Sequence, residues 1–344
     1  MNAPINIGMV GLGFMGQTHI KAYQQIPQAN IAAICDAVSL PADGVLRGVA
    51  GNIASTDQIR FDLAVVKGYR DYREMLANPA VQLVDICLPT ALHAEVAIAA
   101  LRAGKHVICE KPLARTSGVC REILAAAASA RGYFMPAHCL RFWPEWAWLK
   151  SAITDGRFGR VLTAKFTRLS EPPAWSQGSY LKGAESGGAL LDLHIHDSDF
   201  VQFCFGRPRA VMSTGQSRLS GALDHVFTLY QVACGASVMA EGTWLMGPGH
   251  GFKMAYTAVF ENATVDYDST RGAEGLKVFA PGKAPEVVTC GGGDGYVGEL
   301  KHMIESIAAG RPPTVVTGAD GLGAVEICEA EERSAQRGEL VRLD

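Results

Sequence analysis

The sequence predicts an α/β protein with two domains, a doubly wound parallel sheet followed by an antiparallel sheet with one face partly covered. The first part of the chain alternates short, wholly apolar runs with helix-like runs, which is typical of parallel strands buried on both faces. After about residue 125, runs of alternating apolar and polar residues follow without long helices between them, which indicates antiparallel strands. The length of 344 residues also fits two domains, which we expect to span 1–125 and 126–344.

The hydrophobic pattern of the first domain predicts its elements in order. The apolar runs predicted to be buried strands are at 5–10, 31–36, 83–88 and 106–109. The helices predicted between and after them are at 18–25, 72–77, 91–103 and 118–130. Residues 37–67 are expected to form a loop and a helix, which is long for a crossover.

The second domain is expected to begin with an aromatic-rich helix at 142–153. The alternating runs predicted to contain its strands are at 160–169, 210–219, 226–233, 237–245 and 253–265. Two more helices are predicted near the C-terminus, at 298–309 and 324–337. Gly310 and Gly338 directly follow them and are expected to end them.

Composition narrows the classes of partner and the cellular setting. Lys plus Arg total 31 against 34 for Asp plus Glu, so no basic surplus is available to neutralise a nucleic-acid backbone. No apolar run approaches the roughly 20 residues that cross a bilayer, and the N-terminus has no signal-peptide pattern. None of the nine cysteines forms a C-x-x-C pair. We therefore expect a cytoplasmic protein with no nucleic-acid or membrane partner.

A glycine-rich turn, GLGFMG, follows the first predicted strand and opens a helix. This is the context in which G-x-G-x-x-G binds a dinucleotide. The first glycine permits the tight turn, the second lets the backbone approach a pyrophosphate, and the third lets helix and strand pack closely. The alternative is a glycine turn without a ligand. The residues expected to hold the pyrophosphate at the helix N-terminus are Gly11, Gly13, Phe14, Met15 and Gly16.

Asp36 ends the second predicted strand, about twenty residues after the glycine turn. An acid at this place accepts hydrogen bonds from the ribose 2′-hydroxyl. Its charge would repel a 2′-phosphate, and no arginine follows within several residues. The sequence therefore favours NAD over NADP as the cofactor.

Glu110, Lys111 and Pro112 close another strand of the same domain. In open α/β sheets, ligands bind at the carboxyl ends of the strands. A lysine there can hydrogen-bond a substrate hydroxyl, and Pro112 restricts Lys111 to extended geometry and leaves a cis bond open. We place Glu110 and Lys111 among the cofactor-binding residues. Taken alone, however, the pattern fits a solvated lysine in a turn better than a catalytic one.

The densest polar cluster of the chain surrounds Asp192 and His196. On a helix these two residues share a face, and a histidine beside an acid can take a proton from an alcohol near neutral pH. One alternative is a helix capped by Asp192 with His196 satisfied in the core. Another is a metal pair of His194 and His196, but no third and fourth ligand follow at a clear spacing. We expect no metal.

Other polar and aromatic residues are weaker candidates, for which ordinary packing is an equal alternative. After a strand end, three residues could touch the nicotinamide side of the cofactor, and His93 could equally be a helix-start residue. These three are Pro89, Thr90 and His93. The candidates for substrate contact are His138, Arg141, Trp175 and His194.

Together these motifs resemble the family of glucose–fructose oxidoreductase, inositol dehydrogenase and rhizopine-catabolism proteins (Gfo/Idh/MocA). The resemblance spans nearly the whole chain, through GLGFMG, DICLPTALH, AGKHVICEKPLA, LRFWP and SGGALLDLHIHDSD. EKP combined with a downstream D-x-x-x-H is far more specific than the glycine motif alone. One departure is His194, which stands where many members have glycine and would narrow the site or add a second titrating group.

The resemblance implies an N-terminal Rossmann domain and a C-terminal α/β domain with a large, open, mostly antiparallel sheet. In the family that sheet commonly mediates dimers or tetramers, so we expect a homodimer or homotetramer. The resemblance also implies that Lys111 contacts substrate and nicotinamide ribose. His196 is then the acid/base, with Asp192 as its partner.

The expected function is an NAD-dependent dehydrogenase acting on a secondary alcohol of a sugar, cyclitol or related polyol. A first alternative is a glycosidase that uses NAD for transient oxidation and releases no net NADH. A second is a regulator that binds NAD and a sugar without catalysis. A metal hydrolase using the two histidines of the polar cluster comes last.

Overall fold

The structure is a computed structural model that describes residues 3–48, 58–173, 178, 180–291 and 293–343. The chain divides into two compact units. The first unit comprises Met1–Cys139 and Asp294–Leu322, and the second comprises Leu140–Gly293 and Gly323–Asp344. The boundary predicted at 125/126 falls inside helix α4 (Ser117–Ser129), so these units divide the chain differently from the predicted domains.

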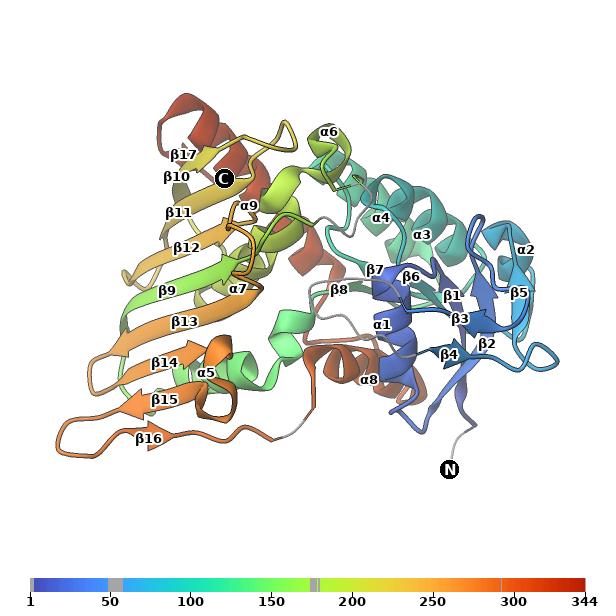
Figure 1. Ribbon diagram of the computed structural model, residues 1–344, viewed down its shortest axis with the longest axis horizontal. Coiled ribbons are helices and arrows are strands. Elements are labelled where there is room, and N and C mark those ends of the chain that lie inside the picture. The colour runs from blue at the N-terminus through green and yellow to red at the C-terminus, as the bar shows by residue number, and fades with distance from the viewer. Residues whose placement is uncertain (1–2, 49–57, 174–177, 179, 292, 344) are drawn as a thin grey trace. The chain divides into compact units, whose positions relative to one another are not determined.

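The first unit contains a six-stranded sheet in the order β5-β2-β1-β6-β7-β8, with every neighbouring pair parallel. Its strands are β1 (Ile5–Val10), β2 (Ala29–Cys35), β5 (Lys67–Tyr69), β6 (Leu83–Ile86), β7 (His106–Glu110) and β8 (Phe134–Ala137). Its helices are α1 (Phe14–Tyr23), α2 (Tyr72–Leu76), the 3₁₀ turn η1 (Thr90–Leu92), α3 (His93–Arg102), α4 and α8 (Gly295–Ala308). Figure 1 shows α3 and α4 on one side of this sheet and α1 and α8 on the other. The predicted doubly wound sheet is confirmed, in the strand order of a Rossmann fold.

The central strands are buried on both faces, as their unbroken apolar runs predict. Val107 and Ile108 are adjacent on β7, so their side chains point to opposite faces of the sheet, and both are fully buried. Asp85 of β6 is also fully buried and is an acid within an otherwise apolar strand. A buried carboxylate requires partners, and these are described below.

The long segment after β2 differs from its prediction. The described parts of 37–67 contain turns and a two-stranded antiparallel ribbon, β3 (Val45–Leu46) with β4 (Ile59–Arg60), and the predicted helix is not found in them. Residues 49–57 lie outside the described residues. A short ribbon of two residues per strand leaves no sequence periodicity that distinguishes it from a loop or helix.

The second unit is built on a nine-stranded sheet in the order β16-β15-β14-β13-β9-β12-β11-β10-β17. The strands are β9 (Val161–Leu169), β10 (Ala210–Gln216), β11 (His225–Gln231), β12 (Ser237–Thr243), β13 (Lys253–Phe260), β14 (Thr264–Asp268), β15 (Leu276–Phe279), β16 (Glu286–Val287) and β17 (Val341–Arg342). Among the described pairs, only β9 with β12 is parallel, so the predicted mostly antiparallel sheet is confirmed. Figure 1 shows the strands side by side from β16 to β10.

Several short helices accompany this sheet. They are η2 (Cys139–Phe142), α5 (Pro144–Thr154), α6 (Gly183–Ser186), the π-helical turn η4 (Leu190–His194), α7 (Ile195–Phe205) and η5 (Ser269–Glu274). Helix α9 (Gly318–Arg337) begins in the first unit and continues into the second. No helix of the described chain is both long and apolar enough to span a bilayer.

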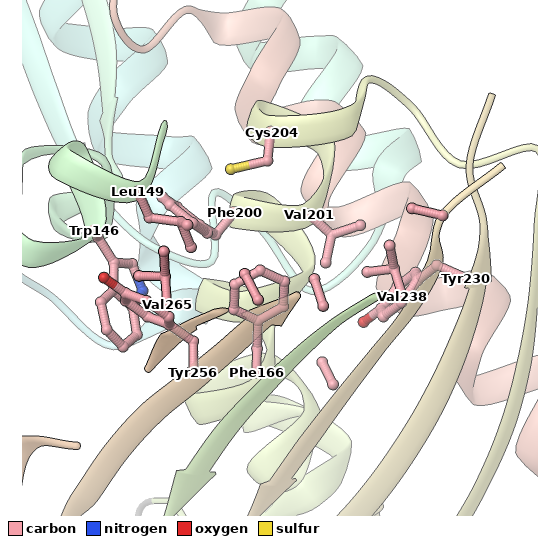
Figure 2. Packing of buried hydrophobic residues seen from close by; sticks show 14 of the residues in the cluster. Trp146, Leu149, Phe166, Phe200, Val201, Cys204, Tyr230, Val238, Tyr256 and Val265 are labelled. Atoms are coloured by element: carbon pink, nitrogen blue, oxygen red, sulfur yellow. The ribbon is translucent and has the colours of Figure 1, made fainter. Parts of the chain in front are cut away.

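The core of the second unit lies between the sheet and the helices α5, α7 and α9. Alternate residues of β13 are buried, as the alternating pattern predicts for a sheet covered on one face. Figure 2 shows Phe200 of α7 close to Phe166 of the sheet, and their ring centroids are 5.6 Å apart. The ring centroids of Trp146 of α5 and Tyr256 are 4.6 Å apart, in an edge-to-face arrangement. This packing determines which side of α7 faces the sheet. The residues on its other sides are therefore turned away from the sheet.

Candidate functional site

The three motif glycines at the N-terminus of α1 differ in what a side chain at each position would meet. Gly11 has φ +94, and a Cβ there would collide with the carbonyl oxygen of Cys87. A Cβ on Gly16 would collide with the carbonyl oxygen of Gly11. Gly13 is exposed at the N-cap, and a Cβ there would meet no protein atom within 4 Å. The fold therefore requires the first and third glycines, while the second leaves open space at a helix N-terminus, which suits a pyrophosphate.

This difference gives a matched pair of variants. We expect Gly13→Ser to keep the melting temperature, because serine caps helices well and the φ of −71 suits any residue. Its affinity for NAD should fall by about tenfold or more, since the new side chain enters the space of the pyrophosphate. Gly16→Ser should instead lower the unfolding free energy by about 1–3 kcal/mol. Calorimetry and NAD titration test both, and wild-type NAD affinity in Gly13→Ser would contradict the assignment.

Asp36 lies next to the glycine turn, directly after β2. Its Oδ2 accepts the backbone N–H of Leu12 at 2.9 Å, and its Oδ1 accepts those of Val38 and Ser39 at 2.9 and 2.6 Å. The carboxylate thus braces the turn. With about four lone-pair sites it can still accept a ribose hydroxyl, so the arrangement fits the predicted NAD-binding role.

The residues predicted on the nicotinamide side differ in exposure. Pro89 is exposed and Thr90 half-buried at the start of η1. His93 is buried, with Nδ1 2.9 Å from the carbonyl oxygen of Pro112 and Nε2 2.8 Å from that of Leu88. Burial lowers the pKa of His93 and outweighs the two carbonyl contacts, which raise it. Both ring nitrogens contact the loops after β6 and β7, so His93 connects these two loops, and its contact with the cofactor stays a prediction.

Glu110 is the last residue of β7, and Lys111 directly follows it. The Glu110 carboxylate is buried, where its Oε2 accepts the backbone N–H of Lys111 at 3.0 Å and its Oε1 lies 3.1 Å from Nε2 of His19. Lys111 is half-buried, and its peptide bond to Pro112 is cis. The Glu110 side chain is therefore engaged inside the first unit, and its role in cofactor binding stays a prediction.

Asp192 and His196 lie in the second unit at the junction of η4 and α7. Both are half-buried, whereas the neighbouring His194 and Asp197 are fully buried. Asp192 does not cap α7 and lies within the π-helical turn. π-Helical turns are rare in proteins, and those that occur are often found at functional sites. The structure therefore leaves the predicted acid/base pair partly accessible on a segment whose other side is packed.

His194 belongs to a different environment. Its Nε2 lies 3.3 Å from the Glu331 carboxylate and 3.1 Å from the Tyr230 hydroxyl, and that hydroxyl donates to Glu331 at 2.6 Å. All three side chains are buried. Among the described residues, the groupings close enough to hold a metal include neither His194 nor His196. His194 is a core residue of the second unit, which disfavours the metal pair, and its contact with substrate stays a prediction.

Two buried ion pairs hold α7. Arg168 of β9 donates from Nε and Nη2 to Asp197 at 2.9 and 3.2 Å. Arg141 donates from Nε and Nη2 to Asp199 at 2.8 and 2.7 Å, and it is buried. Arg141 therefore holds α7 in place, and its contact with substrate stays a prediction. The acids of both pairs lie within three residues after His196 and fix the helical segment that carries it.

The remaining predicted contacts are His138 and Trp175. His138 is buried at the end of β8, and Trp175 lies outside the described residues. Sequence reasoning missed His19, three residues beyond the glycine motif, and its partner Asp85. The available signal for Asp85 was a lone acid inside an apolar strand run.

Two family models match the chain. One, described as "Oxidoreductase family, NAD-binding Rossmann fold", matches residues 5–138, and the other, "GFO/IDH/MocA C-terminal domain", matches residues 146–266. Both matches agree with the fold described above.

Relatives of known activity match as well. Levoglucosan dehydrogenase of Pseudarthrobacter phenanthrenivorans is 34% identical over 214 residues, which cover 60% of this chain and only 53% of that protein. Inositol 2-dehydrogenase of Rhizobium meliloti is 26% identical over 356 residues, 96% of each chain. A solved structure of levoglucosan dehydrogenase with NADH and L-sorbose matches with a TM-score of 0.85 and 25% identity over 100% of both chains.

Proposed function

The chain belongs to the Gfo/Idh/MocA family of NAD-binding oxidoreductases, and on that premise we propose that it oxidises a secondary alcohol of a sugar, cyclitol or related polyol. The observation that carries the proposal is that Asp192 and His196, at the junction of η4 and α7, are partly accessible while their neighbours in the chain are buried. The substrates named for the relatives, levoglucosan and inositol, are cyclic compounds with several ring hydroxyls.

Each residue has a role in this proposal. The glycine turn and Asp36 hold the cofactor, which supplies the hydride acceptor when bound. His196 takes the hydroxyl proton, and Asp192 orients His196 or binds a neighbouring hydroxyl. Lys111 positions the substrate oxygen and stabilises its developing negative charge, because a cation in a water-poor site acts more strongly than in bulk water.

A spectrophotometric screen tests the function. Purified protein is mixed with sugars, cyclitols, sugar acids and aryl glycosides, each with NAD or NADP, and the absorbance of the reduced cofactor is followed. Substrate-dependent NADH supports the dehydrogenase and identifies its alcohol. Release of the aglycone without NADH supports the NAD-using glycosidase instead. Tight binding of NAD and a sugar without turnover would favour the regulator.

Cofactor preference gives a further prediction. We expect Asp36→Ser to raise the KM for NAD about 10–100-fold, because a hydrogen bond to a charged group contributes about 1.5–3 kcal/mol. The KM for NADP should fall, since the repulsion of the 2′-phosphate is removed. The measurement is the ratio of kcat/KM for the two cofactors, with the melting temperature as a control for the braced turn. An unchanged ratio would refute this role.

We also propose a cytoplasmic homodimer or homotetramer that associates through the open face of the nine-stranded sheet. Met212 and Leu229 are cross-strand partners on β10 and β11, and they are 39% and 46% exposed. Exposed apolar residues in one row are typical of an interface. All nine cysteines are free, as expected in a reducing compartment. Light scattering of Leu229→Lys tests the assembly, since a charge there should dissociate it.

A further inference from the structure

A buried ionisable cluster lies in the first unit, formed by α1, β6, β7 and α8. His19 of α1 is at its centre: Nδ1 lies 2.9 Å from Asp85, and Nε2 lies 3.1 Å from Glu110 and 3.8 Å from Glu299. The side chains of His19, Asp85 and Glu299 are fully buried and that of Glu110 nearly so. Three carboxyl groups around one imidazole inside a core require a charge arrangement that leaves little net charge.

The surroundings indicate where the protons are. Burial alone would lower the pKa of His19, but Asp85 and Cys87 outweigh it and raise this pKa well above 6.5. Burial opposes ionisation of Glu110, yet contact with His19 lowers its pKa. Burial raises the pKa of Glu299 well above 4.5. These directions favour a protonated His19 facing an ionised Glu110, and they favour the protonated form of Glu299.

The cluster continues to the residue proposed to act on the substrate. The same Glu110 carboxylate that faces His19 accepts the backbone N–H of Lys111 at 3.0 Å. The contacts form a chain from Asp85 through His19 and Glu110 to the backbone at the end of β7. Without a cation beside it, a buried carboxylate would take up a proton or turn away, and it would then hold this backbone less firmly.

We propose that His19 is a positioning residue for Lys111, holding the Glu110 carboxylate where it accepts the Lys111 backbone N–H. This inference rests on the proposed function of Lys111. His19 itself touches no reacting atom in it. Its effect comes from fixing the direction in which the lysine leaves the strand, and a displacement of about 1 Å costs about 10²-fold in rate.

The same atoms lie close enough together to hold a divalent cation. Two ligands of a tetrahedral zinc ion lie about 3.3 Å apart when each is about 2.0–2.1 Å from the metal. The 3.1 Å separation of His19 and Glu110 is that of a direct contact, and the imidazolium already offsets the charge of Glu110. We therefore favour a proton over a metal, and the test below includes metal content.

Two substitutions of His19 separate its two contacts. The amide nitrogen of His19→Asn stands where Nδ1 is and retains the contact with Asp85, whereas that of His19→Gln stands where Nε2 is and retains the contact with Glu110. Both remove the charge of one buried imidazolium, so their losses of melting temperature should be similar. Tyr23→Phe is the control, because Tyr23 is buried, interacts with Asp85 and has no contact with Glu110 among those described.

We expect His19→Asn to lower kcat about 10–100-fold with less than threefold change in NAD affinity, and His19→Gln to recover most of that loss. Tyr23→Phe should keep the wild-type kcat. Hydrogen exchange of the peptide across 106–115 should become faster in His19→Asn only, since it reports the Lys111 amide directly. Metal content of the wild type should be negligible.

The outcomes separate this inference from the function on which it rests. Equal kcat in the Asn and Gln variants, or unchanged hydrogen exchange in His19→Asn, would overturn the positioning role. Stoichiometric metal that both variants lose would also overturn it. A wild type that oxidises no alcohol would contradict the proposed function, while the hydrogen-exchange comparison would still decide whether His19 holds the backbone of Lys111.

Discussion

His196→Ala is expected to lower kcat about 10²–10⁴-fold, the usual contribution of a general acid or base. The imidazole is the proposed proton acceptor, and alanine leaves no group to replace it. NAD affinity should stay nearly unchanged, because the glycine turn and Asp36, which are proposed to hold the cofactor, belong to the other unit of the chain. The measurement is steady-state kinetics on the alcohol found in the screen, with NAD binding followed separately.

A matched control is available on the same unit. His250 is an exposed histidine, and His250→Ala should keep the wild-type kcat. The melting temperature of His196→Ala should also remain close to that of the wild type, since His196 is only half-buried. If NAD affinity collapsed in His196→Ala while kcat survived, the role assigned to His196 would be wrong.

Arg168→Met is expected to lower the unfolding free energy by about 3–5 kcal/mol, because it leaves Asp197 charged and buried without its cation. Both side chains are nearly or fully buried, and two of the guanidinium nitrogens donate to the carboxylate. The double variant Arg168→Met/Asp197→Leu removes both charges and should recover most of the loss. Denaturant unfolding of the wild type, both single variants and the double variant measures the coupling.

The double variant also tests what the pair does for the site. Asp197 directly follows His196, so the ion pair fixes the segment on which the proposed base stands. A stable double variant with reduced kcat and wild-type NAD affinity would mean that the pair positions His196. Single-variant losses that simply add in the double variant would show that the two side chains do not act as a pair.

Local pattern was sufficient for most of the architecture. Apolar runs such as Ile5–Val10 and alternating runs such as Lys253–Phe260 become strands in the structure, because burial on two faces or one leaves a direct trace in the sequence. The strand Phe134–Ala137 was missed, since it is short and contains Pro136, which is uncommon inside a sheet. The membership of 294–322 in the first unit depends on contacts distant in sequence and has no local signal.

The candidate site also has features that the local sequence predicts and features that depend on contacts distant in sequence. The glycine turn, Asp36, Lys111 and the pair of Asp192 and His196 are recognisable from the sequence, because their chemistry depends on residue type and near spacing. The sequence left several interpretations of these residues open, and the structure decides those that depend on whether a side chain is buried. It places His194 in the core with Glu331 and leaves His196 partly accessible, although the two are separated by one residue.

The sequence by itself thus determined the family resemblance, the two kinds of sheet and the residue types of the proposed chemistry. Only the tertiary structure decided which polar and charged side chains are occupied by contacts within the fold: Arg141 with Asp199, His93 with two carbonyl oxygens, and Glu110 with His19. The reason is physical. A buried polar group must find its partner wherever the folded chain brings one, and these partners lie far apart in sequence, where neither periodicity nor spacing can pair them.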